Sequence, residues 1–281
     1  MDSRNVKRSK FYLRKVFLSK KPSFFCYMKY LISWVSRNIP RKFIQLFAHK
    51  LIKLYSLILQ GDQVHCPICN KSFRKFLPYG RMFPRENALC PSCLSLERHR
   101  LMHLFLQNET NYYTSKPKVL HIAPEYCFID RFEKYLGENY ITADIESPLA
   151  KVKMDLHHIP FEDNSFDVVF CNHVLEHVKD DVQCMKEIRR VLKSDGFALC
   201  QSPQRYDLET TYEDASITDP KEREKHFLQD DHLRIYGRDY GDQLKSSGFN
   251  VEEVSMVEKI GLIEAKKMAL PLEEIIYLCK K

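Results

Sequence analysis

From about Lys116 to the C-terminus, short apolar runs alternate with stretches of helical periodicity. Such alternation is typical of βαβ units, in which helices connect parallel strands. Strands are predicted over residues 119–123, 140–144, 152–155, 166–172, 197–201, 249–256 and 275–279, and helices over 128–135, 181–192 and 238–247. We expect Gly196 to form a left-handed turn after the second helix. The sequence therefore predicts an α/β fold with a doubly wound, mostly parallel sheet.

Glycine is scarce, and its spacing excludes two common nucleotide-binding loops. The 281 residues include 8 glycines, and no two of them stand two positions apart. Because P-loops and dinucleotide-binding loops need closely spaced glycines, neither class of loop fits this chain. A hydrophobic content of 44% with 29% charged residues also argues against collagenous, low-complexity and multi-span membrane proteins.

Four of the ten cysteines form two C-x-x-C pairs, Cys66-Pro-Ile-Cys69 and Cys90-Pro-Ser-Cys93. Each pair can occupy two adjacent corners of a tetrahedron, so we predict one structural zinc ion bound by all four sulfurs, with no open position for water. Free thiols or a redox pair are the alternative, although a redox motif needs only one C-x-x-C before a helix. The other cysteines are scattered and are expected in the core, as in a protein of a reducing, cytoplasmic compartment.

The basic residues are concentrated at the N-terminus. Residues 1–60 hold fourteen Lys/Arg and one acid, a charge of +13, so residues 61–281 carry −6 of the total +7. Apolar residues between Phe43 and Ile58 follow helical spacing, which predicts one or two amphipathic basic helices. We expect neither a membrane span nor a signal peptide here. Three partners fit such helices: an anionic membrane surface, the acidic remainder of this chain, and nucleic acid.

The predicted sheet has a ligand-binding edge, because open α/β sheets bind ligands outside the carboxyl ends of their strands. The residues at these ends are Ala123, Pro124 and Glu125, then Asp144 and Ile145, then Asp155 and Leu156, then Asn172 and His173. Asp144 is placed to accept hydrogen bonds from a ribose diol. Asp155 can accept from an adenine amine while Leu156 offers its backbone N–H. The alternative for each aspartate is that it caps the following turn.

Three segments then resemble one family. Residues 154–169 (MDLHHIPFEDNSFDVV), 173–178 (HVLEHV) and 187–196 (EIRRVLKSDG) are similar to class I S-adenosylmethionine-dependent methyltransferases of the type 11 subgroup. The resemblance covers about residues 117–281 and implies a Rossmann-like, seven-stranded sheet. It also implies that Asp144 binds the ribose and Asp155 the adenine of S-adenosylmethionine.

The first loop departs from the family pattern. The family usually has D-x-G-x-G-x-G after the first strand, whereas this chain has His121 in place of the aspartate, and Ala123, Glu125 and Cys127 in place of glycines. Either Glu125 replaces backbone contacts by pairing with the ammonium group of the cofactor, or cofactor binding has been lost. We favour the first interpretation, and we count His121, Ala123 and Pro124 with the cofactor loop. A further alternative is that Glu125 only caps the next helix.

Methyl transfer to a hydroxyl needs a base with a pKa near neutrality. His173 is the leading candidate, with Glu176 and His177 one turn further on; the alternative is that these histidines cap or pack. A polar insertion adds His226 and residues 229–237, in which His232, Arg234 and Tyr236 alternate. A strand there would point all three to one face and form a lid on the acceptor side, unless the segment is only a salt-bridged loop.

Residues 98–100, just after the second cysteine pair, either couple the zinc module to the same cleft or form a solvated helix face. The predicted domains are residues 1–60 (basic amphipathic segment), 61–115 (zinc module and linker helix) and 116–281 (methyltransferase). The expected function is methylation of a hydroxyl or carboxyl group on a polar small molecule, sugar or glycan intermediate, in the cytoplasm or at the inner membrane face. The alternatives are an RNA base methyltransferase of the ribosomal type and a non-catalytic zinc-stabilised scaffold.

Overall fold

The computed structural model describes residues 51–80 and 84–281 of the chain. The chain divides into two units, residues 1–55 and 56–281. Of the first unit only residues 51–55 are described, and they are helical. The amphipathic helices predicted in residues 1–60 therefore lie almost entirely outside the described residues. The second unit contains both cysteine pairs and all the predicted strands.

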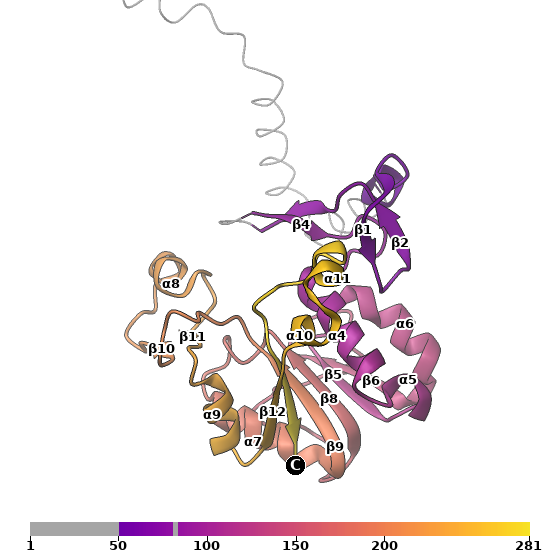
Figure 1. Ribbon diagram of the computed structural model, residues 1–281. Helices are drawn as coiled ribbons and strands as arrows, with labels where there is room; N and C mark the ends of the chain where they lie inside the picture. The colour runs from indigo at the N-terminus through magenta and orange to yellow at the C-terminus, as the bar shows by residue number, and fades with distance from the viewer. Residues whose placement is uncertain (1–50, 81–83) are drawn as a thin grey trace, which may run out of the picture. The chain divides into compact units, whose positions relative to one another are not determined.

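A seven-stranded sheet forms the centre of the second unit (Figure 1). Its strands are β5 (Val119–Ile122), β6 (Tyr140–Asp144), β7 (Val152–Lys153), β8 (Phe166–Asn172), β9 (Leu192–Gln201), β12 (Asn250–Val254) and β13 (Ile276–Lys280). The spatial order is β12-β13-β9-β8-β5-β6-β7. Strand β13 is antiparallel to both of its neighbours, and the other pairs are parallel. The predicted mostly parallel sheet is confirmed.

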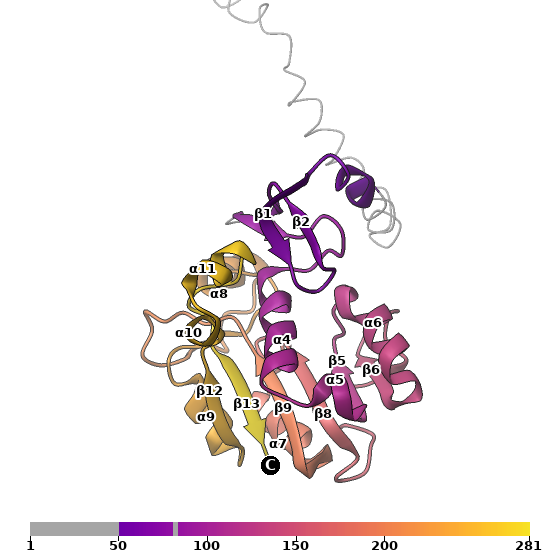
Figure 2. The same ribbon diagram turned by 45° about the vertical axis from the view of Figure 1, so that its right-hand side comes forward.

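Helices cover both faces of this sheet (Figure 2), because the buried strands are apolar on both sides. On β8, Val168 and Phe170 contribute to one core, while Val169 and Cys171 contribute to the other. The first core includes side chains from α4 (Glu97–Asn108), α5 (Tyr112–Ser115) and α6 (Tyr126–Leu136). A short 3₁₀ turn (Gly137–Asn139) connects α6 to β6. The second includes side chains from α7 (Asp181–Val191) and α9 (Tyr240–Ser246).

One local prediction is wrong. Helix α7 passes directly into β9, which begins at Leu192, and Gly196 lies inside that strand without a left-handed backbone conformation. A Cβ atom at Gly196 would lie 2.6 Å from the carbonyl oxygen of Asp167 on β8. The glycine therefore serves the close approach of two strands, and a turn is not needed.

The cysteine pairs belong to a small module of two β-hairpins. Strand β1 (Gln60–Cys66) pairs with β2 (Lys71–Phe73), and β3 (Leu77–Tyr79) pairs with β4 (Arg85–Leu89), both antiparallel. Buried side chains of the module, among them Phe73 and Phe76, belong to the same hydrophobic core as α4 and α6. The module therefore shares its core with the sheet domain.

Two further segments complete the unit. The polar insertion contains β10 (Tyr212–Glu213), α8 (Pro220–Phe227) and β11 (Arg234–Ile235), and the C-terminal region contains α10 (Met256–Ile260) and α11 (Leu262–Lys267) before β13. In Figures 1 and 2, α11 lies close to the cysteine module. Within residues 51–80 and 84–281, no helix has both the length and the apolar character needed to cross a membrane.

Candidate functional site

A large cleft opens beside the carboxyl ends of β8 and β9. Its volume is about 1660 Å³, and its walls come from four parts of the second unit: the cysteine module with the start of α4, the loops after β8 and β9, the polar insertion, and the segment before β13. His173, Glu176 and His177 line it, whereas Asp144 and Asp155 are outside its lining. The cleft is therefore separate from the two predicted cofactor aspartates and lies toward the predicted acceptor side.

The first loop, at the end of β5, has an unusual backbone. Ala123 has a φ of +49°, a left-handed conformation in which glycine is favoured. Pro124 is buried behind it. A glycine would adopt this conformation without the cost that a Cβ atom adds at Ala123.

Glu125 points inward from this loop and joins two strands. Its carboxylate contacts Nε2 of His121 on β5 and accepts a hydrogen bond of 3.1 Å from the side-chain amide of Asn172 on β8. His121 is fully buried, and its Nδ1 is hydrogen-bonded to the Tyr140 hydroxyl at 2.7 Å. Glu125 is the N-cap residue of α6, but its side chain makes no capping hydrogen bond, so the capping alternative is wrong.

The charge of Glu125 is stabilised inside the protein. Burial alone raises the pKa of this carboxyl, and the contact with His121 outweighs that effect, so the pKa falls to about 2. The side chain of Glu125 is 11% exposed, which leaves a small part of its surface for a ligand. The Oδ1 atom of Asn172 is buried and has no hydrogen-bond partner among the described residues, so it is an unsatisfied acceptor next to Glu125.

Asp144 and Asp155 stand at the ends of β6 and β7, and each caps a turn. Oδ1 of Asp144 accepts hydrogen bonds of 2.7 Å from the backbone N–H groups of Glu146 and Ser147. Oδ1 of Asp155 accepts from the backbone N–H of His157 at 2.9 Å and lies 2.7 Å from its ring Nδ1. In both aspartates the turn uses Oδ1. The second carboxylate oxygen, Oδ2, can accept hydrogen bonds from a ligand, so one aspartate can cap its turn and bind a ligand at once.

The two apolar neighbours of these aspartates differ. Ile145 is 55% exposed, whereas the side chain of Leu156 is 5% exposed. An exposed isoleucine beside Asp144 is suited to cover an apolar or aromatic ligand face, whereas the buried side chain of Leu156 is not.

His173 follows β8 in a strained conformation. Its φ is +56°, which is uncommon for a residue with a side chain, and its Nε2 is buried without a partner among the described residues. Its Nδ1 lies 3.5 Å from Oε1 of Glu176. Glu176 is almost fully buried; burial acts to raise its pKa, but His173 and His177 hold the pKa below the usual value. His173 thus lines the cleft beside the carboxylate of Glu176, and its Nε2 is a buried ring nitrogen without a partner among the described residues.

The alternating residues of the insertion have separate roles. Arg234 is buried and donates to the backbone carbonyls of Leu175, Val178 and Lys179, at 2.6 to 3.0 Å. The Tyr236 hydroxyl donates to Asp181 at 2.6 Å. These two side chains hold the insertion against the loop after β8. Arg234 also forms a salt bridge of 2.9 Å with Glu213, so the segment is salt-bridged as well as packed, and its action as a lid stays a prediction.

The other histidines of the insertion differ in burial. His232 is buried at the cleft, and its ring lies 4.6 Å from that of His177, measured between centroids. His226 is exposed and contacts Tyr212 at 3.0 Å.

Residues 98–100 do not form a solvated helix face. Arg98 lines the cleft, and its Nε is buried without a partner among the described residues. His99 is buried, and burial lowers its pKa to about 3. Arg100 is fully buried and donates to the carbonyls of Met268 (2.8 Å) and Ala269 (2.6 Å).

Arg100 also donates to the carbonyls of Ala88 and Ser95, each at 3.0 Å. One side chain therefore connects the cysteine module to the C-terminal segment.

Sequence reasoning missed Glu274, which lines the cleft just before β13. Burial raises the pKa of Glu274, and the positive charges of His173 and Arg98 act against that rise. Arg98 and Glu274 are 176 positions apart, and neither lies in a motif. No local signal distinguishes Glu274 from the other acids of the chain.

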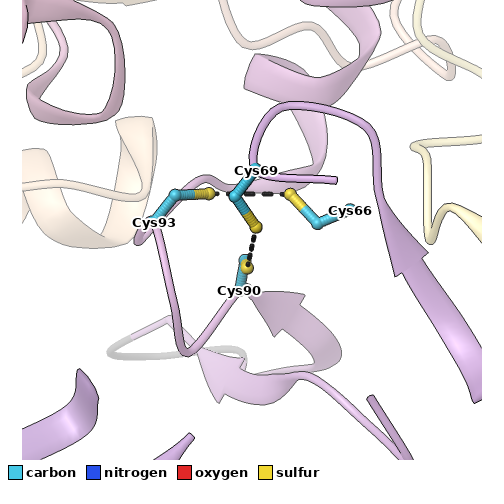
Figure 3. A group of neighbouring side chains, drawn as sticks. All are labelled: Cys66, Cys69, Cys90 and Cys93. Carbon is cyan, nitrogen blue, oxygen red and sulfur yellow. Dashed lines mark hydrogen bonds between the residues drawn. The ribbon is translucent and has the colours of Figure 1, made fainter. Parts of the chain in front are cut away.

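The four cysteines of the two pairs converge on one point (Figure 3). The Sγ atoms of Cys66 and Cys93 are 3.5 Å apart, those of Cys69 and Cys90 are 3.7 Å apart, and all four lie within 4.8 Å of one another. Sulfurs that bind one zinc ion tetrahedrally at about 2.3 Å are separated by about 3.8 Å, so the arrangement fits that ion.

Each cysteine pair lies on its own turn, and the two turns have the same backbone conformation. After Cys69 and after Cys93 the next residue is left-handed, and its N–H donates to the carbonyl of the first cysteine of the pair, at 2.8 and 2.9 Å. The same turn conformation thus presents both pairs of sulfurs to the centre.

Comparisons with known proteins agree with this architecture. A family described as "Methyltransferase domain" matches residues 122–200. An uncharacterized methyltransferase of Schizosaccharomyces pombe is 29% identical over 97 residues, which are 32% of this chain and 32% of that protein. The tRNA U34 carboxymethyltransferase of Nautilia profundicola is 30% identical over 125 residues, 44% of this chain and 38% of that protein. This chain thus spans only about a third of the length of these relatives.

Shorter or more distant similarities include a demethylmenaquinone methyltransferase and a solved structure. The former, from Staphylococcus epidermidis, is 41% identical over 59 residues, 21% of this chain and 24% of that protein. A SAM-dependent methyltransferase of Archaeoglobus fulgidus has 16% identity and a TM-score of 0.41, covering 64% of this chain and 93% of that one. Residues 122–200 thus match a methyltransferase domain, and the sequence relatives that are named for an activity are methyltransferases or a carboxymethyltransferase, in agreement with the enzyme class that the sequence predicts.

Proposed function

We propose that this chain is an S-adenosylmethionine-dependent methyltransferase that acts on a hydroxyl or carboxyl group of a polar small molecule or glycan intermediate. The observation that carries the proposal is the position of His173: it follows β8, between the loops with the cofactor aspartates and the acceptor-side cleft. Asp144 is assigned to the ribose, Asp155 and the Leu156 backbone to the adenine, and the Glu125 and Asn172 groups to the methionine part.

S-adenosylmethionine supplies a sulfonium methyl group, and the protein must hold an acceptor oxygen in line with it. For a hydroxyl acceptor, Nε2 of His173 would take up the hydroxyl proton, and the methyl group that the cofactor supplies would pass to the acceptor oxygen with S-adenosylhomocysteine as the leaving group. Glu176, 3.5 Å from Nδ1, holds the ring and stabilises its protonated form. A carboxylate acceptor needs no base, so the dependence on His173 distinguishes the two acceptor classes.

The test is formation of S-adenosylhomocysteine and methylated product with a panel of hydroxylated and carboxylated acceptors, measured by mass spectrometry. His173→Asn is the preferred variant, because asparagine tolerates the left-handed backbone. Transfer to a hydroxyl should slow by about 10²-fold or more, the usual contribution of a general base. His226→Asn, on an exposed ring of the insertion, is the control and should keep the wild-type rate. Equal rates for all three proteins on a hydroxyl acceptor would exclude His173 as the base.

We also propose that the four clustered cysteines hold a structural zinc ion and that the protein is cytoplasmic. None of the nine cysteines in the described residues forms a disulfide, which agrees with a reducing compartment. No water-activating role is assigned to this zinc, since four protein sulfurs complete its tetrahedron.

The proposed partner of residues 1–60 is an anionic membrane surface, on the strength of their charge of +13. Full-length protein should bind vesicles that contain anionic lipid, less so at high salt, and deletion of residues 1–60 should abolish binding without loss of cofactor affinity. Binding of structured RNA with a steep salt dependence, and none to vesicles, would favour the RNA methyltransferase alternative. Aggregation of the truncated protein without either kind of binding would indicate packing on the acidic remainder.

A further inference from the structure

Three metal-ligating side chains meet at the wall of the cleft, apart from the cysteine cluster. Glu176, His177 and His232 each offer one ligand atom, and these three atoms lie within 4.8 Å of one another. Oε1 of Glu176 is 4.0 Å from Nε2 of His177. Glu176 and His177 come from the loop after β8, whereas His232 is brought to them by the insertion, 55 residues later in the chain.

His232 is in the form that binds metal ions. Its Nδ1 lies 3.1 Å from the backbone carbonyl of Phe227, so Nδ1 carries the proton and donates it. The other nitrogen, Nε2, then has a lone pair, and it is buried without a hydrogen-bond partner among the described residues. The whole residue is 3% exposed. A buried, unpaired acceptor is costly, and a bound cation would satisfy it.

The neighbouring groups orient the other two ligands. Ser202 donates a hydrogen bond of 2.8 Å to Oε2 of Glu176, which leaves Oε1 facing the histidines. Nδ1 of His177 lies 3.5 Å from the carboxylate of Asp231. Metal-binding histidines usually donate their second nitrogen to a carboxylate or a backbone carbonyl, and both histidines have such a partner.

We propose that Glu176, His177 and His232 form a site for one divalent transition-metal ion, such as Mn²⁺, Co²⁺ or Zn²⁺. Two imidazoles and one carboxylate suit these ions and leave positions open for water or a ligand. Ligand atoms about 2.1 Å from a tetrahedral ion are about 3.4 Å apart, so the site must contract on binding. The side chain of His177 is 32% exposed and has room to move.

The metal site itself does not depend on the proposed methyl transfer. The functional role of the ion does depend on it. Glu176, His177 and His232 line the cleft, so the open positions of the ion would face the proposed acceptor. The ion would then hold an acceptor oxygen near His173. Binding of the ion and binding of the cofactor are therefore measured separately.

The experiment is a Mn²⁺ titration of the full-length, zinc-loaded protein, followed by the loss of the free Mn²⁺ signal in electron paramagnetic resonance. Mn²⁺ is the probe because it favours oxygen and nitrogen ligands and competes poorly for thiolates. We expect one Mn²⁺ per chain, and at least tenfold weaker binding in His232→Gln and Glu176→Gln. His226→Gln, which alters an exposed histidine of the same insertion, should bind as the wild type does.

Because His232 and Glu176 are buried, their variants are checked by thermal unfolding, and His177→Gln provides a partly exposed ligand change that should weaken binding without unfolding the protein. The proposal is overturned if the zinc-loaded wild-type protein binds no Mn²⁺ and added Co²⁺ gives no absorption band from nitrogen and oxygen ligands. It is equally overturned if His177→Gln, folded, binds Mn²⁺ as tightly as the wild type. Neither result bears on cofactor binding, which a separate titration decides.

Discussion

The side-chain amide of Asn172 donates a 3.1 Å hydrogen bond to the carboxylate of Glu125, and this bond joins the end of β8 to the loop after β5. The acid of the first loop is thus displaced by four positions relative to the related family: His121 stands where the family has aspartate, and Glu125 returns a carboxylate to the same region. The loop thus carries a negative charge at the end of β5, where the resemblance predicts the cofactor, without the glycines of the family pattern.

Glu125→Gln should lower the free energy of unfolding at pH 7 by about 1–3 kcal/mol, because it replaces a charged acceptor of two buried hydrogen bonds. The pKa of Glu125 is about 2 in the folded protein, against 4.5 for an ordinary glutamate. Its contribution is therefore complete above about pH 4.5 and is lost as the pH falls toward 2. Chemical unfolding at several pH values should show the difference from wild type shrinking over that interval.

Glu133→Gln is the matched control for that experiment, since Glu133 lies on the same helix, α6, and its side chain is 49% exposed. It should change the free energy of unfolding by no more than about 0.5 kcal/mol at any pH. A constant difference between Glu125→Gln and wild type from pH 7 to pH 3 would contradict the assigned pKa.

Ala123→Gly should stabilise the fold by about 0.5–1 kcal/mol. The left-handed backbone at Ala123 costs about 1–2 kcal/mol for a residue with a Cβ atom, and the added entropy of glycine in the unfolded chain offsets part of the gain. Ala143→Gly, in the buried strand β6, is the comparison and should destabilise by about 1 kcal/mol. If both glycine variants lose stability, the Ala123 conformation is not strained.

The purified protein should contain one zinc ion per chain, measured by elemental analysis. Cys90→Ser should release it and destabilise the protein, because metal binding at such a site is coupled to folding. Cys184→Ser removes a buried thiol on α7, far from the cluster in the chain, and should leave the zinc content unchanged. If the native protein contains no zinc and all four thiols of the cluster react with a thiol reagent, the predicted zinc site does not exist.

Much of the fold was predictable because the strands are local hydrophobic runs. The expected limits of β8 are those observed, and β5, β6 and β13 are shifted by no more than one residue. Gly196 was misjudged because its role is the approach of β9 to Asp167, a contact that no local pattern encodes. For the same reason a turn signal, however strong, does not by itself predict where a helix gives way to a strand.

The candidate site was only partly predictable. Strand ends identify Asp144, Asn172 and His173, because the carboxyl edge of a parallel sheet follows from the order of the elements. The inward direction of Glu125 depends on His121 and Asn172 together, and the meeting of His232 with Glu176 depends on how the insertion folds. Such contacts arise only in the folded chain.

Arg100→Met should lower the free energy of unfolding by at least about 3 kcal/mol. It removes a charged donor from four backbone carbonyls, of which those of Ala88 and Ser95 are buried and those of Met268 and Ala269 are partly buried. Arg189→Met is the control, since Arg189 makes one exposed hydrogen bond, to the carbonyl of Gly248. Chemical unfolding measures both variants. A small and similar loss of unfolding free energy in the two would contradict a stabilising role for the hydrogen bonds of Arg100.

Asp144→Asn should weaken S-adenosylmethionine binding by about 1.5–3 kcal/mol, the range for hydrogen bonds to a charged group. Asparagine keeps an oxygen for the turn formed with Glu146 and Ser147, so the backbone should be preserved. Asp214→Asn alters an aspartate that caps a similar turn in the insertion and should leave the affinity unchanged. If Asp144→Asn and Asp214→Asn both bind S-adenosylmethionine as tightly as the wild type, Asp144 only caps its turn.

The most direct measurement is calorimetric titration of the full-length, zinc-loaded wild-type protein with S-adenosylmethionine. Asp144, Asp155, Glu125 and Asn172 together predict saturable binding at one site per chain, with S-adenosylhomocysteine competing for the same site. No detectable binding by a folded, zinc-containing protein would contradict the methyltransferase assignment and leave a zinc-stabilised scaffold in its place.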